Sequence, residues 1–443
     1  MAPASVALAK QSGAAEPAAP YVSWSRRVPV RYEAEVAVLG GGIAGVSAAC
    51  AAARSGARVV LVERFAVTGG VLVTGGVSNF CGQQEGQGEV FDCILEDLGR
   101  FNAFESKAPE RDGYGGIIRP FHYETLAVVL QELLLKRKVK LLLHTRLADV
   151  NVSRRRITEC LVAGKSGLEA IRARQFIDCT GEADVARFAC FATVKGRSSD
   201  HLQLPMSMMY FVRHVEPRDA FLRLPEGWFH PVKTKEDLPQ TSIWPDGPRS
   251  NALKVKIPKF DATSTEGLTA AEIRGRRRML EVLSYFQEVE KRPWRLDHCS
   301  PIIGIREGCR IVGDYVLKVE DLRAGRVFDD GVARGTFYLD AHSVDEEKKG
   351  ALLPQDQWYV PPYQIPLRSL IARDAKNLMM AGRCFSADQL ALSSARVSTS
   401  GSMMGQAAGI AAALAVQKKC DPRECDPAAV KKIVLERGGM LKC

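Results

Sequence analysis

The chain lacks the features that would set it apart from ordinary globular proteins. None of its apolar runs approaches the roughly 20 residues that a membrane-spanning helix needs, so the sequence argues against an integral membrane protein. Its 12 cysteines are scattered and form no CxxC pair, which argues against a structural zinc site. We see no repeat at a fixed period. With 46% hydrophobic and 25% charged residues, the composition excludes disorder, collagen and coiled coil as descriptions of the whole chain.

What is present is a chain of 443 residues with a formal net charge of +10. At about 100–200 residues per domain, this length predicts two or three structural units. The charge favours anionic ligands without specifying nucleic acid. The Ala- and Pro-rich segment 1–20 is typical of a flexible leader rather than a signal peptide. Because we interpret most cysteines as buried thiols in a reducing compartment, we expect a cytoplasmic protein.

The first ordered unit is predicted to be a βαβ motif. Residues 34–39 (AEVAVL) and 57–62 (ARVVLV) have the pattern of buried strands, and the alanine-rich residues 43–55 have the pattern of a helix. The unit has about the 30 residues expected of a strand, a crossover helix and a parallel strand.

A glycine motif joins the first strand to the helix. The run GGGIAG at 40–45 satisfies GxGxxG, and Glu63 ends the next strand 18 residues after Gly45. In this context Gly40 permits a tight turn, Gly42 lets the backbone approach a pyrophosphate, and Gly45 lets helix and strand pack closely. Glu63 would accept hydrogen bonds from ribose hydroxyls. The alternative, a glycine-rich turn without a nucleotide, is disfavoured by the full pattern.

The rest of the chain alternates between strands and helices. The pattern predicts a helix at Tyr123–Lys136, strands at 139–143, 148–152, 157–162 and 170–177, and helices at 267–291 and 300–318. Within 377–416 it predicts a strand, a loop and a long Ala- and Gly-rich helix, 401–415. Prolines and tryptophans increase between residues 202 and 297, which indicates a separate substrate-facing domain.

Four further strings carry a family resemblance over about residues 33–420. They are GGVLVTGGVSNFCG at 69–82, GIREGCRIVGDYVL at 304–317, NLMMAGRCFSADQLALSSARV at 377–397 and GSMMGQAAGIAAALAV at 401–416. Together with DCTGEAD at 178–184, they resemble FAD-dependent oxidoreductases of glutathione-reductase-like fold, related to fumarate reductase and glucose-inhibited-division-like flavoproteins.

The resemblance implies an α/β fold in which a Rossmann-like FAD-binding domain carries an inserted α+β substrate domain. The expected division is a leader (1–30), an FAD-binding domain in two parts (31–200 and 300–420), a substrate domain (201–299) and a C-terminal tail (421–443). The FAD-binding residues expected from the motif and the resemblance are Gly40, Gly42, Ile43, Ala44, Gly45, Glu63, Arg64, Gly69, Gly70, Thr74, Gly75, Gly76, Thr180, Gly181, Asp184, Gly382, Arg383, Gly401 and Met403.

Three arginines are candidates for binding an anionic substrate. Arg306 and Arg310 lie four residues apart in the predicted helix 300–318, on one face, where an anion would relieve their repulsion. Internal pairing with Glu307 or Asp314 is the equally weighted alternative. Arg396 precedes the last long helix, at a place that the resemblance puts near the flavin.

Other candidates have a more probable structural role. Tyr363 is a possible acid, and His122 beside Tyr123 is more often a structural histidine. Cys81 follows the flavin-side loop and is more often a small buried residue than a redox partner or covalent anchor. No histidine lies between Glu63 and Phe80, so we predict non-covalent FAD. The cysteines lack paired metal-ligand spacing, so we predict no metal.

The expected reaction is hydride transfer between a small, anionic organic substrate and the flavin. Because the chain has one GxGxxG, we expect a separate electron carrier or the substrate itself to reduce FAD. An oxygen-using monooxygenase or halogenase is the alternative, although the halogenase motif WxWxIP is missing. A non-catalytic protein on this fold, like the GDP-dissociation inhibitors, would not need every FAD segment. Basic runs at 136–140, 154–156 and 274–278 favour a solvated face over nucleic-acid binding.

Overall fold

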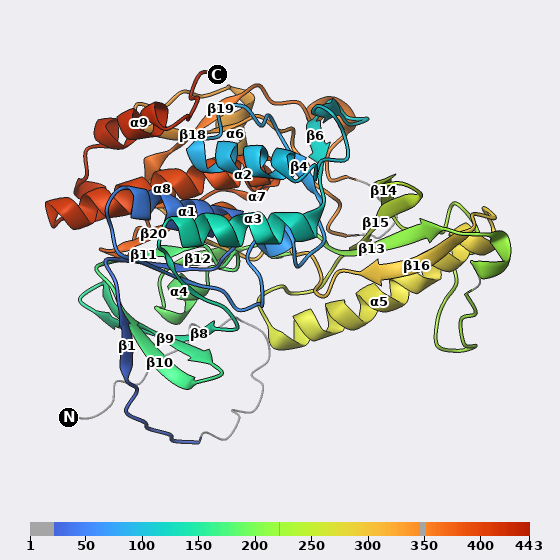
Figure 1. Cartoon of the computed structure of the whole chain (residues 1–443), viewed down its shortest axis with the longest axis horizontal. Helices are drawn as coiled ribbons and strands as arrows, with labels where there is room; N and C mark the ends of the chain where they lie inside the picture. Colours follow the sequence, from blue (N-terminus) through green and yellow to red (C-terminus); the bar gives the residue numbers. More distant parts are fainter. Residues whose placement is uncertain (1–21, 221, 346–350) are drawn as a thin grey trace.

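The computed structural model describes residues 22–220, 222–345 and 351–443 (Figure 1). Most of the predicted leader therefore lies outside the described residues. The centre is a five-stranded parallel sheet, whose strands in spatial order are β20 (Leu378–Met380), β11 (Gln175–Asp178), β2 (Val36–Leu39), β3 (Val59–Val62) and β7 (Lys140–Leu142).

The central strands are apolar because both faces of the sheet are covered. Every residue of β2 and β3 is buried, as expected for parallel strands between two layers. One layer contains α1 (Ile43–Arg54), α3 (Tyr123–Lys136) and α8 (Ser398–Lys418). The antiparallel strands β8, β9 and β10 lie on the other side (Figure 1). Their bounds are Arg146–Ser153, Arg156–Gly164 and Gly167–Arg172, and β1 (Val30–Glu33) pairs with β10.

Helices α1 and α8 run parallel and pack through small residues. A Cβ added at Gly405 would lie 2.1 Å from the Ala44 carbonyl oxygen, and one at Gly409 would lie 2.2 Å from that of Ala48. The Oγ atoms of Ser47 and Ser402 are 2.8 Å apart. Because the helices are parallel, their N-termini lie at the same end of the crossing, beside the carboxyl ends of the central strands.

A second, antiparallel sheet extends from this body (Figure 1). Its strands in spatial order are β14 (Thr241–Pro245), β15 (Ser250–Ile257), β13 (Met206–His214) and β16 (Trp294–Cys299). Helix α5 (Thr265–Glu288) packs on one face and buries Val282 and Phe286 in a separate apolar cluster with the strands. The sheet falls within the predicted substrate domain, whose boundaries stay a prediction.

The remaining elements surround the parallel sheet. The strands are β4 (Asn79–Cys81), β5 (Glu110–Arg111), β6 (Ile117–Pro120), β12 (Thr193–Lys195), β17 (Cys309–Ile311), β18 (Gly331–Gly335) and β19 (Tyr363–Pro366). The helices are α2 (Glu89–Arg100), α4 (Asp184–Phe188), α6 (Val319–Arg323), α7 (Gln389–Ala395) and α9 (Pro427–Glu436). Among the described residues, no helix has the length and apolarity needed to cross a bilayer.

Most predicted elements are present, with three corrections. The predicted helix 300–318 is wrong: the segment is irregular, bridges to Ser207 at Gly304 and forms β17. Its backbone groups bond to Ser207 and to β12 rather than to one another, as a helix would require. The predicted strand 170–177 is two strands in different sheets, β10 and β11. The last long helix begins at Ser398, three residues before Gly401.

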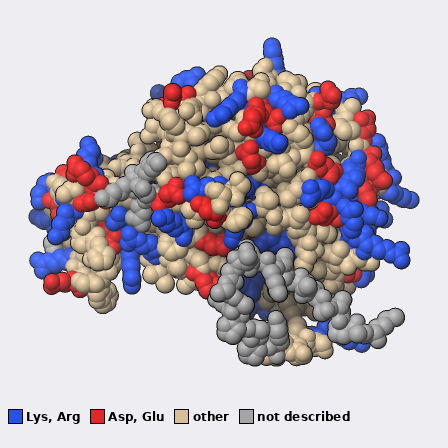
Figure 2. Space-filling view, turned by 180° about the vertical axis from the view of Figure 1, so that it is seen from behind, with Lys and Arg blue, Asp and Glu red and all other residues tan. Residues whose placement is uncertain are grey.

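The basic run at 274–278 forms ion pairs within helix α5, and Lys136 and Arg156 of the other two runs each pair with an aspartate. Arg274 and Arg278 both contact Glu281, and Arg276 contacts Glu272. Figure 2 shows Lys and Arg side chains interspersed with Asp and Glu over this face of the molecule. These observations support the interpretation of the basic runs as solvated or internally paired.

The α1–α8 crossing gives a stability prediction. Gly409→Val places a branched side chain against the Ala48 carbonyl, so we expect the free energy of unfolding to fall by about 1–3 kcal/mol in a urea titration. Gly99→Ala is the matched control, because no atom lies within 4 Å of the added Cβ and alanine favours a helix by about 0.5 kcal/mol. Equal stability of the two variants would contradict this account of the crossing.

Candidate active site

A cavity of about 800 Å³ lies at the carboxyl ends of the parallel strands. The residue after each of four strands borders it: Gly40 after β2, Glu63 after β3, Cys179 after β11 and Ala381 after β20. This edge is where doubly wound sheets bind ligands, because the loops there diverge and leave a crevice. Its volume is within the range of small-molecule and cofactor sites.

The first side of the cavity is the glycine turn before α1. A Cβ at Gly42 would meet no atom closer than the Gly70 Cα at 4.0 Å, so the turn leaves open space on its cavity side. The first helical hydrogen bond runs from the Val46 N–H to the Gly42 carbonyl, and Gly42 offers no side-chain cap. The N–H groups of the first turn are therefore free to bind an anion, assisted by the helix dipole.

Gly40 and Gly45 have a different role from Gly42. A Cβ at Gly45 would lie 1.9 Å from the Gly40 carbonyl oxygen, and one at Gly40 would lie 2.3 Å from that of Cys179. Gly40 also has a φ of 102°, where side chains are strained. These two glycines allow β2, α1 and β11 to approach one another, as the motif predicts.

Glu63 holds the next turn. Its carboxylate accepts hydrogen bonds from the Gly41 N–H at 2.7 Å and the Phe65 N–H at 2.9 Å. Burial raises its pKa above the ordinary value, and these two backbone donors oppose the shift. The side chain is 5% exposed and borders the cavity, so its remaining acceptor capacity faces the cavity.

The segment DCTGEAD forms a second tight turn. Asp178 accepts hydrogen bonds from Thr180 and from the Val185 N–H at 2.9 Å, which places Thr180 and Gly181 on the cavity wall. Burial and the nearby Glu182 charge raise the pKa of Asp184 to about 6. The carboxylate of Glu182 binds Arg383 at 2.8 Å.

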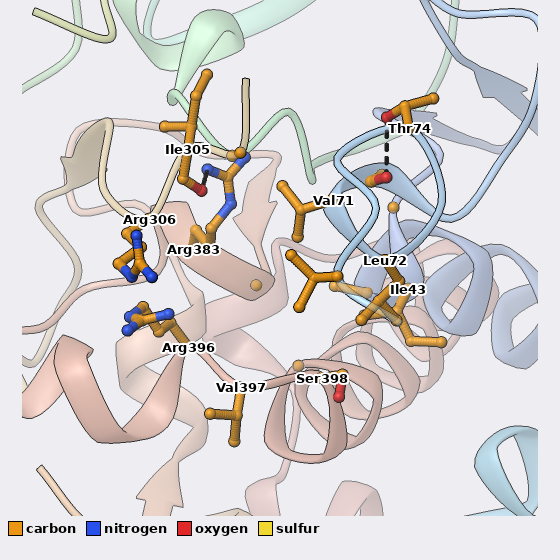
Figure 3. Close-up of a pocket in the computed structure, with 18 of the residues that line it drawn as sticks. Ile43, Val71, Leu72, Thr74, Ile305, Arg306, Arg383, Arg396, Val397 and Ser398 are labelled. Carbon is orange, nitrogen blue, oxygen red and sulfur yellow. Dashed lines mark hydrogen bonds between the residues drawn. The ribbon is translucent and has the colours of Figure 1, made fainter. Parts of the chain in front are cut away.

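The N-terminus of α8 is the third component. Its N-cap is Val397, which provides no side-chain cap, and the first helical bond runs from the Gly401 N–H to the Val397 carbonyl. Val397, Ser398 and Gly401 border the cavity, and Figure 3 shows the first two at the start of this helix. The positive end of the helix therefore faces the same space as that of α1.

Arginines and lysines gather at the end of the cavity next to the second sheet; we call Lys254, Lys256, Arg306 and Arg396 the cation cluster. The guanidinium groups of Arg306 and Arg396 face each other from different elements in Figure 3. Burial and the charge of Arg396 lower the pKa of Arg306 to about 10. Burial and the charge of Arg306 lower the pKa of Lys254 to about 8.

One carboxylate, Asp340, lies within the cation cluster. It contacts Arg396 at 2.7 Å and the Nε2 atom of His342 at 2.9 Å. Although burial opposes ionisation, the contact with His342 and the charges of Arg396 and Lys254 hold the pKa of Asp340 well below its ordinary value. Arg306 instead hydrogen-bonds to the Pro205 carbonyl at 2.8 Å and the Ser207 Oγ at 2.6 Å. Both of these hydrogen-bond partners are uncharged.

Aromatic rings form a wall of the same cavity. The rings of Tyr338 and Trp358 are 5.7 Å apart and nearly parallel, and Tyr114 lies 4.9 Å from Trp358. All three border the cavity, as does Trp244. A ligand at this end therefore meets both cations and flat apolar surfaces.

The structure brings most of the predicted site residues together. Those that border the cavity are Gly40, Gly42, Ile43, Ala44, Glu63, Arg64, Gly69, Gly70, Thr74, Thr180, Gly181, Asp184, Arg306, Gly382, Arg383, Arg396 and Gly401. Four predicted FAD-binding residues do not border the cavity: Gly45, Gly75, Gly76 and Met403. Met403 is fully buried in the core, and a Cβ at Gly75 would lie 2.9 Å from the Val71 carbonyl oxygen.

Two of the catalytic candidates do not reach the cavity. Arg310 forms a buried ion pair with Glu307 and donates to the Gly196 carbonyl at 2.8 Å, which is the internal pairing considered from the sequence. Because the segment is not helical, Arg306 and Arg310 do not share a helix face. Tyr363 is 0% exposed and its hydroxyl bonds to Ser394 at 2.7 Å. The structure therefore does not support ligand contacts by Arg310 or Tyr363.

The surroundings of Cys81 and His122 show what each side chain does. Cys81 borders the cavity, but burial raises the pKa of its thiol to about 12, so it is a thiol rather than a nucleophilic thiolate at neutral pH. His122 is the N-cap of α3 and accepts from the Thr125 N–H. It therefore has the structural role that its position beside Tyr123 suggested.

The sequence interpretation missed Lys254, Lys256, Asp340 and His342. A signal for the lysines was present, because residues two apart in a strand point to the same face, and 250–257 has a strand pattern. Asp340 and His342 lie in an irregular segment after β18, where sequence patterns do not predict spatial neighbours.

Comparison with known proteins identifies the cofactor. A family model described as FAD dependent oxidoreductase matches residues 35–434. No curated protein matches the chain. Among solved structures, one similar protein is a geranylgeranyl bacteriochlorophyll reductase-like protein from Thermoplasma acidophilum, with 13% identity and a TM-score of 0.50, covering 92% of this chain and 84% of that chain. This likeness confirms the Rossmann-like α/β fold and shows no more than the fold.

Two other solved structures are similar at a lower level. One is p-nitrophenol 4-monooxygenase PnpA from Pseudomonas putida DLL-E4, with 13% identity and a TM-score of 0.49; the match covers 92% of this chain and 87% of that chain. The other is OxyS anhydrotetracycline hydroxylase from Streptomyces rimosus, with 13% identity and a TM-score of 0.46; the match covers 91% of this chain and 65% of that chain.

The cavity fits FAD. The open side of Gly42 and the uncapped N-terminus of α1 suit a pyrophosphate. Glu63 provides acceptors for ribose hydroxyls, and the uncapped N-terminus of α8 suits the flavin edge that gains negative charge on reduction. The predicted cofactor is therefore supported both by the family and by the geometry of the cavity.

Substitutions at Gly42 and Gly45 test whether the glycine turn before α1 binds the cofactor. Gly42→Val has room in the fold but fills the space for the pyrophosphate, so we expect folded, colourless protein. Gly45→Val overlaps the Gly40 carbonyl, so we expect loss of folding itself. Circular dichroism and flavin absorbance separate the two outcomes. Folded Gly42→Val protein with full FAD content would show that this turn does not bind the pyrophosphate.

We also predict that FAD is non-covalent. Cys81 is the candidate covalent anchor beside the flavin-side loop, but its thiol is protonated at neutral pH. Denaturing the holoprotein in acid and filtering it is expected to put all the yellow colour in the filtrate. Colour that remains with the polypeptide, and is lost in Cys81→Ser, would identify Cys81 as an anchor instead.

Proposed function

The chain belongs to the family of FAD-dependent oxidoreductases, and from that premise we propose that it transfers a hydride between a small anionic organic substrate and the flavin. In this proposal Arg306 and Arg396 bind the anionic group of the substrate. The observation that carries it is their arrangement: both border the cavity, they come from different elements, and their guanidinium groups face each other (Figure 3).

Charge supports an anionic ligand between the arginines. Two guanidinium groups that face each other in a buried site repel, and the lowered pKa of Arg306 reflects burial and the charge of Arg396. Asp340 neutralises Arg396, whereas Arg306 bonds to oxygen atoms without charge, those of the Pro205 carbonyl and the Ser207 hydroxyl. A carboxylate would satisfy the donors of Arg306 bidentately and remove the repulsion.

The protein's own contribution to the reaction is position and charge. When bound, FAD supplies the two-electron acceptor or donor. The turn at Gly42 and the α8 N-terminus hold the cofactor, and Arg306 and Arg396 orient the substrate at the end of the cavity nearest the second sheet. The aromatic wall excludes water from the reacting carbon and strengthens these charge interactions.

An oxygen-using monooxygenase is the second candidate. Two of the structurally similar proteins are a monooxygenase and a hydroxylase, but similarity at that level does not carry an argument about the reaction. The two reactions are separable by oxygen. A hydride-transfer enzyme is reduced by its substrate anaerobically, whereas a monooxygenase requires a reductant and consumes one O2 for each product formed.

The anion site gives a direct prediction. Arg306→Gln removes a charged donor, so we expect the dissociation constant of a simple carboxylate, such as benzoate, to rise about 10- to 150-fold, equivalent to 1.5–3 kcal/mol. Arg396→Gln is expected to act in the same direction. Binding is measured by the change in the flavin spectrum of the holoprotein, and FAD content is expected to stay at the wild-type value.

Arg218→Gln is the matched control, because this arginine side chain is 86% exposed and does not border the cavity. Its carboxylate affinity is expected to equal that of the wild type. Unchanged affinity in both Arg306→Gln and Arg396→Gln would remove the proposed anion site.

A further inference from the structure

We propose that Lys256, linked through His342 to Asp340, is the acid–base group of the reaction, and that the substrate is a carboxylic acid with a hydroxyl or amino group on the carbon that loses hydride. This inference rests on the proposed function, because it places the substrate's carboxylate at Arg306 and Arg396. It adds the group that moves the proton and the chemical class of the substrate.

The geometry is a chain of contacts that begins at the cavity wall. The Nζ atom of Lys256 hydrogen-bonds to the Nδ1 atom of His342 at 2.6 Å and also to the Gln240 side-chain oxygen. The Nε2 atom of His342 lies 2.9 Å from the Asp340 carboxylate. Lys256, His342 and Asp340 come from segments far apart in sequence, and each borders the cavity.

The two hydrogen bonds accommodate a neutral lysine with its lone pair available, when the histidine is the tautomer with its proton on Nε2. A neutral amine has two N–H donors, and Gln240 and the His342 Nδ1 atom accept both. The lone pair of the Lys256 Nζ atom takes no part in these two bonds, and Lys256 borders the cavity. The acceptor role of Nδ1 places the histidine proton on Nε2, toward Asp340.

Burial and charge favour the same protonation state. Lys256 is 3% exposed. Burial, reinforced by the charges of Lys254 and Arg306, lowers its pKa well below the ordinary value, and Arg396 acts in the same direction, while Asp340 opposes it. Burial likewise lowers the pKa of His342 well below its ordinary value. A neutral base beside a carboxylate site is the arrangement that general base catalysis requires.

The chemistry balances with the cofactor that the family uses. The substrate's O–H or N–H bond breaks and its proton goes to the lone pair of Lys256. The C–H bond on the same carbon breaks and its hydrogen leaves with both electrons to the flavin. The carbon–oxygen or carbon–nitrogen bond becomes a double bond, so the substrate loses two electrons and FAD gains them. Asp340, through His342, stabilises the positive charge that Lys256 acquires.

The test is anaerobic mixing of the holoprotein with both enantiomers of lactate, mandelate, alanine and phenylalanine. Propionate and phenylacetate are the matched carboxylates that lack the hydroxyl or amino group. We expect flavin bleaching by at least one hydroxy or amino acid and by neither matched carboxylate. The bleaching rate is expected to fall as the pH falls through the pKa of Lys256, because protonation removes the base.

Variants separate a proton-transfer role from a structural one. Lys256→Ala is expected to lower the bleaching rate by about 10²- to 10⁴-fold, to lose the acid limb of the pH profile, and to recover rate on addition of methylamine. Its affinity for propionate and its FAD content are expected to remain within about threefold of the wild type. Lys233→Ala, at an exposed lysine outside the cavity, is the control with no expected change.

A second variant covers the case in which Lys256→Ala does not fold. His342→Gln removes the connection to Asp340 that stabilises protonated Lys256, so we expect the acid limb to move to lower pH. Lys254→Ala removes a cation from the same strand and is expected to keep an acid limb.

The outcomes distinguish the inference from the proposed function. If propionate binds in an Arg306-dependent manner but no hydroxy or amino acid bleaches the flavin, the substrate class is overturned and the anion site stands. If bleaching occurs with an unchanged rate and pH profile in Lys256→Ala and His342→Gln, the acid–base assignment is overturned. If no carboxylate binds or reacts, both the inference and the proposed function fail.

Discussion

The parallel crossing of α1 and α8 is the contact on which the cavity depends. The two helices approach so closely that Gly405 and Gly409 face the carbonyl groups of Ala44 and Ala48 without room for a side chain. Because the helices are parallel, this contact places both positive N-termini at the carboxyl edge of the central sheet. Neither N-terminus has a side-chain cap, so both offer backbone donors to a negatively charged cofactor.

The second sheet supplies the charge that the helix ends do not. Lys254 and Lys256 on β15 meet Arg306 and Arg396 at the end of the cavity, with Asp340 as the carboxylate between them. Burying several cations near one anion costs free energy unless a ligand or proton loss compensates. The lowered pKa of Lys256 corresponds to proton loss. The bonds of Arg306 to uncharged oxygen atoms leave its charge for a ligand to compensate. The cost of burying several cations near one carboxylate therefore favours both an anionic substrate and a neutral Lys256.

The sequence predicted the cofactor side of the site well, because that side depends on local rules. The glycine turn at Gly42, the acidic residue at Glu63 and the helix α3 are encoded by neighbouring residues and a regular period. It predicted the substrate side less well. Arg310 was expected beside Arg306 on a helix, but the segment is not helical: Arg306 borders the cavity, whereas Arg310, in β17, pairs with Glu307. The pairing of Lys256 with His342 joins residues 86 positions apart, which no local pattern contains.

The most direct test of this account is a crystal structure of the FAD-loaded protein with a bound carboxylate. We predict that the pyrophosphate lies against Gly42 and the N-terminus of α1, and that the flavin ring lies beside the N-terminus of α8. The carboxylate is predicted to lie between Arg306 and Arg396, on the side of the ring that faces Lys256. Electron density for the carboxylate at any other part of the cavity, with the two arginines in mutual or internal contacts only, would contradict the account.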